Sequence, residues 1–209
     1  MSKLRLASLG ALAIILSSGA ALAQAGLQES GSNSQLVCPS GSDLLSLDYE
    51  EFDAPDEGWR AISQLGCNSQ AADLLGDYRR RHEATLHPDE VRLLKWHEGQ
   101  LRAASGDSRL AVSLFEEVRA QESDPLDRLY TEATIAFLKG DRDALESARR
   151  ELAAIPEPPS FSRAADRYVA QYGLPRPTWP LNLEVVDALV RCFGGPYIEA
   201  YRGCPAGHD

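Results

Sequence analysis

The sequence lacks the short motifs that identify many enzymes and metal proteins. It contains no GxSxG turn for a serine nucleophile, and no GKS or GKT follows the Ser/Gly turn at Pro39–Asp43 to make a phosphate-binding loop. His82 and His87 are five positions apart, and the neighbours His97 and Glu98 point away from each other on a helix. Neither arrangement suits a zinc site, which uses closely spaced ligands. We therefore expect no catalytic residue, no metal and no cofactor, and we predict that the chain is not an enzyme.

Basic side chains are also scarce, and this excludes one class of partner. Lys and Arg number 21 against 31 Asp and Glu, which gives a formal net charge of −10. Loss of Lys3 and Arg5 with the N-terminal segment described next would change this charge from −10 to −12. Phosphate backbones are bound by clustered Lys and Arg. We therefore expect no nucleic-acid partner, and we expect anionic lipid to repel the chain.

Long apolar runs are scarce as well, and the clearest one lies at the N-terminus. Leu6–Leu16 follows the positive residues Lys3 and Arg5 and precedes the small-x-small sequence that ends at Ala23. This order predicts a signal peptide over residues 1–23, cleaved after Ala23 or, as a second option, after Ala25. An uncleaved anchor is the alternative, but it would need roughly 20 apolar residues. We expect an exported protein, periplasmic or secreted, with no membrane span after cleavage.

Cysteine is limited to four residues, and an exported protein would use them as two disulfides. Three pairings are possible, and closeness in the sequence favours Cys38–Cys67 and Cys192–Cys204. The sequence contains no CxxC, so neither a thioredoxin-type redox pair nor a zinc ribbon has support. We therefore interpret both disulfides as structural.

The sequence does contain helical periodicity and an internal repeat. Apolar residues recur at spacings of three and four through most of the chain, and strand-like alternation is nearly absent, so we predict an all-α fold. Residues 92–119 and 126–153 superpose at an offset of 34, which places Trp96 over Tyr130 and Gly106 over Gly140. A repeat of this length is typical of a helical hairpin that must stack on its neighbours.

Glycines, prolines and composition divide the chain into four parts. These are a signal peptide at 1–23, a flexible or irregular leader with Cys38 at 24–52, helical repeats at 53–156, and a helical, Pro-interrupted C-terminal cap at 157–209. The acidic stretch that begins at Asp53 is expected to start the first helix. In the cap, we expect a helix from Ser160 to Tyr172 and a last long helix capped by Asn182.

The repeat resembles a known family. Small residues at positions 8, 15 and 20 and an aromatic at position 24 are typical of tetratricopeptide repeats, and the first unit fills these positions with Gly99, Gly106, Ala111 and Phe115. The chain is similar to this family over roughly residues 56–156. In the second unit, Leu145 replaces the family's Ala and Arg149 replaces its aromatic. The resemblance implies an αα-hairpin solenoid of two to three repeats that ends in the C-terminal cap.

The resemblance also implies a function. In this family a concave groove is lined by the first helix of each repeat, and the positions carried over are Leu93, Trp96, Gln100, Tyr130, Thr134 and Phe137. An exported module of this kind would bind a protein or peptide partner of the cell envelope in that groove. Trp96 and Tyr130 could instead be core residues between repeats. An envelope enzyme or enzyme accessory, with a site between the repeats and the tail, and a purely structural envelope protein are the alternatives. The oligomeric state stays open.

Overall fold

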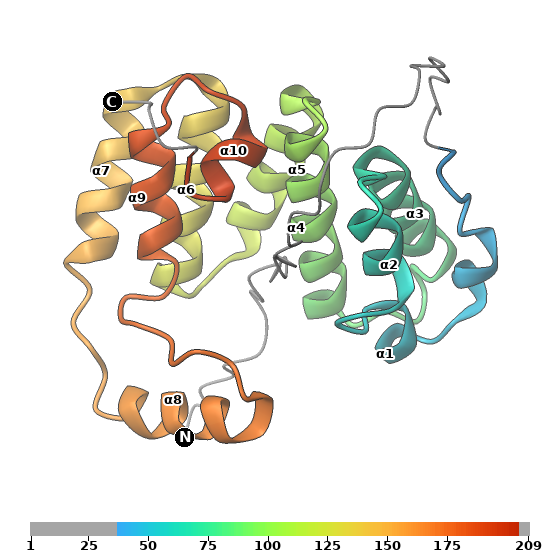
Figure 1. The fold of residues 1–209 in the computed structure, drawn as a ribbon, viewed down its shortest axis with the longest axis horizontal. Coiled ribbons are helices and arrows are strands. Elements are labelled where there is room, and N and C mark those ends of the chain that lie inside the picture. The colour runs from blue at the N-terminus through green and yellow to red at the C-terminus, as the bar shows by residue number, and fades with distance from the viewer. Residues whose placement is uncertain (1–36, 205–209) are drawn as a thin grey trace, which may run out of the picture.

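The computed structural model describes residues 37–204, so the predicted signal peptide lies outside the described residues. The described part of the chain is helical and contains no strand (Figure 1). Its elements are the 3-10 helix η1 (Ser42–Ser46) and the α-helices α1 (Tyr49–Phe52), α2 (Gly58–Gln64), α3 (Asn68–Arg81), α4 (Pro88–Ala104), α5 (Ser108–Gln121), α6 (Pro125–Lys139), α7 (Arg142–Ala153), α8 (Phe161–Tyr172), α9 (Leu183–Arg191) and α10 (Tyr197–Tyr201). The all-α prediction is confirmed.

Consecutive helices pack as antiparallel pairs. α2 lies against α3, α4 against α5, and α6 against α7, and each pair also contacts the next pair along the chain (Figure 1). After α7 the order changes, because α8 lies apart from the other helices and α9 packs on both α6 and α7.

None of the described helices is both long enough and apolar enough to cross a membrane.

Local chemistry explains where the long helices begin and end. Asp107 and Asp141, one repeat apart, each accept a hydrogen bond from a backbone N–H three residues later and so cap α5 and α7. Gly106 and Gly140 precede them with positive φ angles of 88° and 70°, a conformation that favours glycine and reverses the chain. Matching residues thus produce matching turns, as the internal repeat predicts.

The close packing of α4 against α5 depends on Gly99. A Cβ atom at this position would lie 2.7 Å from Cε1 of Phe115, whose side chain is fully buried. The absence of a side chain on α4 therefore makes room for the aromatic ring from α5. This contact gives a physical basis for the pairing of a small residue with an aromatic residue in the first unit.

The first described residues differ from the prediction of an irregular leader up to residue 52. η1 and α1 pack on α3, because Phe52 is fully buried and its ring stacks on that of Tyr78 with 3.7 Å between the centroids. Asp53 does not begin a helix. It ends α1, and its carboxylate accepts hydrogen bonds from Trp59 Nε1 and Arg60 Nη1, both at 2.8 Å. The acidic stretch is thus a connection that holds α2 in place.

Two hydrophobic clusters share α4. Leu94 and Leu101 belong to the cluster built by η1 to α4, whereas Trp96 and Ala103 belong to the cluster built by α4 to α7 together with α9 and α10. α4 therefore presents apolar side chains to both clusters.

Both predicted disulfides are confirmed. Cys38 pairs with Cys67, and Cys192 pairs with Cys204, with Cα–Cα distances of 5.7 and 6.0 Å. Two disulfides indicate an oxidising, extracytoplasmic environment. Asn182, expected to cap the last long helix, does precede α9, but its side chain makes no capping hydrogen bond.

Candidate functional site

The six residues predicted to line a groove lie on α4 and α6, and most of them are buried. Trp96, Tyr130, Thr134 and Phe137 are each at most 6% exposed. Leu93 and Gln100 are partly buried. The structure therefore brings these positions together on facing helices, but it covers them rather than leaving an open groove. Trp96 and Tyr130 are core residues in this state, as the alternative interpretation expects.

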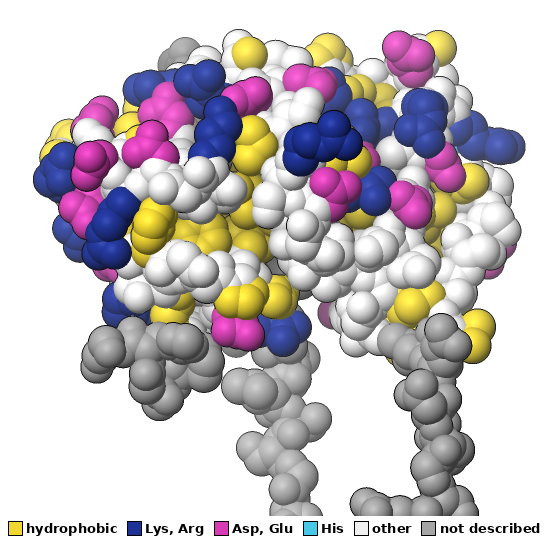
Figure 2. Space-filling model, turned by 90° about the horizontal axis from the view of Figure 1, so that it is seen from above, with side chains coloured by type: hydrophobic (Ala, Val, Ile, Leu, Met, Phe, Trp, Pro, Cys, Tyr) yellow, Lys and Arg dark blue, Asp and Glu magenta, His cyan; other side chains and the backbone are white. Residues whose placement is uncertain are grey.

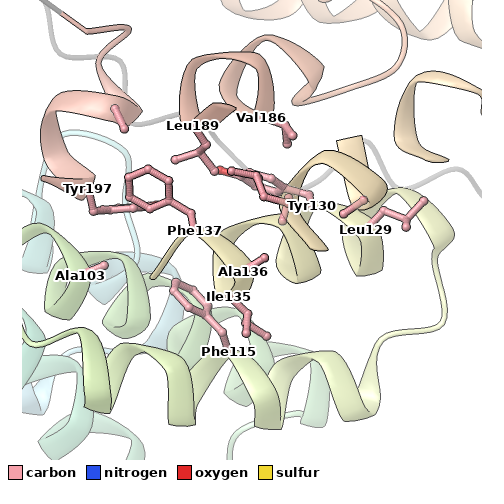
Figure 3. Close-up of a cluster of buried hydrophobic side chains, with 14 of the residues drawn as sticks. Ala103, Phe115, Leu129, Tyr130, Ile135, Ala136, Phe137, Val186, Leu189 and Tyr197 are labelled. Carbon is pink, nitrogen blue, oxygen red and sulfur yellow. The ribbon is translucent and has the colours of Figure 1, made fainter. Parts of the chain in front are cut away.

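The cover is the C-terminal end of the same chain. Figure 3 shows Val186 and Leu189 of α9 and Tyr197 of α10 facing Tyr130 and Phe137 of α6. The rings of Phe137 and Tyr197 approach edge to face, with 6.2 Å between their centroids. α10 also contacts α4. We call the surface of α4 and α6 that carries Trp96, Tyr130 and Phe137 the α4–α6 groove, and α10 packs on it.

Aromatic contacts form the floor of the α4–α6 groove. The Trp96 ring lies 4.7 Å from Phe115 and 5.1 Å from Tyr130, measured between centroids. Thr134 Oγ1 donates to the backbone oxygen of Tyr130 at 3.0 Å, so this hydroxyl is bonded within its own helix and does not face a ligand. The floor is thus aromatic and largely apolar.

Two polar atoms in the groove are poorly matched. Trp96 Nε1 and Tyr197 Oη are buried without a hydrogen-bond partner, although the Gln100 side chain faces Tyr197. Burial raises the pKa of the Tyr197 hydroxyl well above its usual value, and burial likewise raises that of Tyr130. A buried donor without an acceptor costs about 1–3 kcal/mol. The fit of α10 into the groove is therefore imperfect at its polar groups.

A separate polar cluster joins α2 to α4. His97 Nε2 lies 3.2 Å from Arg60 Nη2, and His97 Nδ1 lies 3.4 Å from Gln100 Oε1. Arg60 also pairs with Asp53, which accepts from Trp59. Burial lowers the pKa of His97 to about 4, so this imidazole is neutral at neutral pH. Asp53, Trp59, Arg60, His97 and Gln100 each have a partner within the cluster. The cluster therefore joins α2 to α4 and does not present a free acid or base.

Two arginines of the basic run at the end of α3 form ion pairs. Arg79 pairs with Glu98, which is 4% exposed, and Arg80 pairs with Asp77. Arg102 approaches the same glutamate from α4 at 3.4 Å. The Arg79–Glu98 pair joins α3 to α4, and so does Arg102 through Asp73 at 2.7 Å, whereas Arg80 pairs within α3. Within residues 37–204, no group of three or more His, Cys, Asp or Glu side chains could hold a metal ion.

Two of the cavities on the surface of the described chain bear on a possible site. One, of about 350 Å³, lies over α5, α6 and α7, with Ile135, Ala136 and Ala148 in its wall. Its charged rim is paired internally: Lys139 Nζ lies 2.6 Å from Glu116 Oε1.

The second cavity, of about 300 Å³, is bordered by both Cys192 and Cys204. It lies where α9 ends and the chain turns into α10. Figure 2 looks onto this end of the molecule and shows hydrophobic side chains gathered between charged ones. Phe193 is one of the partly buried hydrophobic residues here, and the Arg142 guanidinium lies 5.5 Å from its ring centroid.

Sequence reasoning did not place α10 in the groove. The available signal was a pair of aromatics, Tyr197 and Tyr201, spaced one helical turn apart in a short segment tied back by Cys204. That pattern indicates a packed helix but does not say against which surface it packs.

Comparisons of this chain with known protein families, with curated proteins and with solved structures find no match.

Proposed function

We propose that this chain is an exported helical-repeat protein of the tetratricopeptide type that binds a short segment of a protein or peptide partner in the α4–α6 groove. The observation that carries the proposal is the groove's present occupant. A five-residue helix of the chain itself, α10, lies there with Tyr197 and Ala200 buried. A surface that accommodates one short helix has the shape and the apolar floor to accept another.

The chemistry of the groove defines the partner segment. An aromatic side chain would replace Tyr197 beside Phe137, because that position is walled by apolar and aromatic groups. A carbonyl or carboxylate oxygen of the partner would accept from Trp96 Nε1, which now lacks an acceptor. Gln100 would supply a further donor or acceptor at the edge. Aromatic anchors in desolvated pockets commonly dominate such interfaces.

Binding requires the partner to exchange with α10. The apparent affinity is then reduced by the small fraction of molecules in which α10 has left the groove. A variant in which α10 is undocked would bind more tightly than the wild type. This relation distinguishes groove binding from binding at any other surface.

The test is capture from an envelope extract by residues 24–209 immobilised through the N-terminus. We expect Tyr197→Ala to retain more of a specific partner than the wild type, and Tyr197→Ala combined with Gln100→Ala to retain less than Tyr197→Ala alone. Circular dichroism checks that both variants remain helical. Trp96→Ala is not a suitable control, because Trp96 packs in the core.

Equal recovery by all three proteins would place the contact elsewhere and overturn groove binding. The absence of any specific partner would favour the alternatives, an envelope enzyme or accessory and a purely structural protein. The polar cluster around His97 does not favour an enzyme, because its side chains are bonded to one another.

A further inference from the structure

The Cys192–Cys204 disulfide lies beside an open cavity on the surface. Both of its cysteines border the open cavity of about 300 Å³ at the end of α9, and Cys204 is the more exposed of the two. Each disulfide joins a buried cysteine, Cys67 or Cys192, to a partly exposed one, Cys38 or Cys204, so the adjoining cavity rather than the exposure of the cysteines is the special feature of Cys192–Cys204. A small thiol can therefore reach the C-terminal disulfide through the cavity.

The same disulfide tethers α10. It joins residues 12 positions apart, so its closed loop contains the whole of α10 together with the turn at Gly194 and Gly195. Cys192 caps the end of α9, which is fixed to α6 and α7 by its apolar face. The bond thus holds the far end of α10 close to a firmly packed helix.

Apart from this bond, α10 is held by the contacts of a few side chains. The helix has five residues; it buries Tyr197 and Ala200, and Tyr201 is partly buried beside Tyr130. Its Tyr197 Oη and the underlying Trp96 Nε1 are buried without hydrogen-bond partners, which weakens the docking. Gly194 and Gly203, at the two ends of the segment, have positive φ angles of 89° and 99°. Opening the disulfide would also restore the freedom that the closed loop removes from the segment.

We propose that Cys192–Cys204 is a site of reversible thiol–disulfide exchange, and that its reduction by a dithiol releases α10 from the α4–α6 groove. One thiolate of the dithiol attacks Sγ of Cys204, the more exposed sulfur, and the Cys192 sulfur leaves as a thiolate that takes up a proton. The second thiol of the dithiol then displaces Cys204 from the mixed disulfide. The dithiol is oxidised to a disulfide, and the two cysteines are left as thiols.

The cavity wall suits this exchange. Arg191 and Glu199 line it together with the two cysteines, so the departing thiolate does not meet a wall of negative charge. Release of α10 would uncover the part of the α4–α6 groove that Tyr197 covers beside Phe137, while α9 stays packed on α6. The regulation of partner binding that follows from this rests on the proposed function, whereas the exchange site and the movement of α10 do not.

The experiment treats the native protein with graded dithiothreitol, blocks free thiols by alkylation, and identifies the modified cysteines by peptide mass. Hydrogen exchange is followed on the same samples. We expect Cys192 and Cys204 to be alkylated about tenfold faster than Cys38 and Cys67, or more. We expect exchange of the α10 amides to rise about tenfold or more while α3 and α5 keep their protection.

Two variants separate tethering from general destabilisation. Cys192→Ser/Cys204→Ser is expected to show the fast exchange of α10 without any reductant. Cys38→Ser/Cys67→Ser is expected to keep α10 protected until dithiothreitol is added. The proposal is overturned if Cys38 and Cys67 react first or at the same rate, or if α10 stays protected after Cys192–Cys204 has been reduced. Because these measurements need no partner, fast reduction with unchanged partner capture would overturn groove binding alone.

Discussion

At the scale of single residues, the small side chain that the repeat pattern requires at Gly99 can be tested through the free energy of unfolding. Gly99→Ala would gain about 1 kcal/mol of helix propensity, but its Cβ would lie 2.7 Å from a buried atom of Phe115. Overpacking of this kind costs about 1–3 kcal/mol. We expect a net loss of about 1 kcal/mol in the free energy of unfolding, measured by urea denaturation. Gly99→Ala/Phe115→Leu should be affected less than the sum of the two single changes predicts, and strict additivity would contradict the contact.

His97 makes stability depend on pH. Its pKa falls from 6.5 to about 4 on folding because the ring is buried. Between these values the unfolded chain binds a proton and the folded chain does not, so stability is lost as the pH falls from about 6.5 towards 4. The loss reaches about 3 kcal/mol.

Urea denaturation at pH 7 and pH 4.5 measures this effect. His97→Gln should remove most of the difference between the two pH values. His87→Gln is the matched control, because His87 caps α4 at an exposed position and should shift both measurements by a similar amount. A pH difference that persists in His97→Gln would assign it to other groups.

At the scale of helices, the sequence correctly predicted helix starts and ends that depend only on neighbouring residues. Pro88 and Pro125 begin α4 and α6, and Gly106 and Gly140 follow their ends, because a cap or a turn needs only neighbouring residues. The prediction that Asp53 begins a helix was wrong, because its role depends on contacts with the following helix. Its acidic neighbours resemble a first helical turn, but its partners Trp59 and Arg60 come from the next helix.

Contacts between residues far apart in the sequence, such as those at the α4–α6 groove, are also beyond what local patterns predict. The spacing of Trp96 and Tyr130 correctly predicts that they share one surface. It cannot predict that α10, about 70 residues after Tyr130, returns to cover that surface, because no local pattern encodes this contact. The cysteines were the exception, since Cys192 and Cys204 are close in the sequence and pair as predicted.

α10 offers a direct test of its polar mismatch. Tyr197→Phe removes a hydroxyl that is buried without a hydrogen-bond partner, so we expect a change of stability between zero and a gain of about 1 kcal/mol. Tyr197→Ala should lose about 3 kcal/mol, because it also removes the buried ring. Thermal and urea denaturation measure both. A loss of 1 kcal/mol or more in Tyr197→Phe would show that Gln100 does bond this hydroxyl.

At the scale of the whole molecule, the N-terminal disulfide should stabilise mainly its own end. Cys38→Ser/Cys67→Ser opens a loop with a sequence separation of 29. The loop-entropy relation gives a loss of about 3–4 kcal/mol. We expect hydrogen exchange to rise most in η1 to α3 and least in α6 and α7. A uniform rise along the chain would contradict this local effect.

The position of α4 between two clusters has a consequence for cooperativity. Leu94 and Leu101 anchor it on one side, and Trp96 and Ala103 anchor it on the other. If either cluster melts, α4 loses its apolar contacts on that side, and the remaining cluster loses part of the support for one of its helices. Two cores that could have melted as independent domains are thereby joined into a single folding unit.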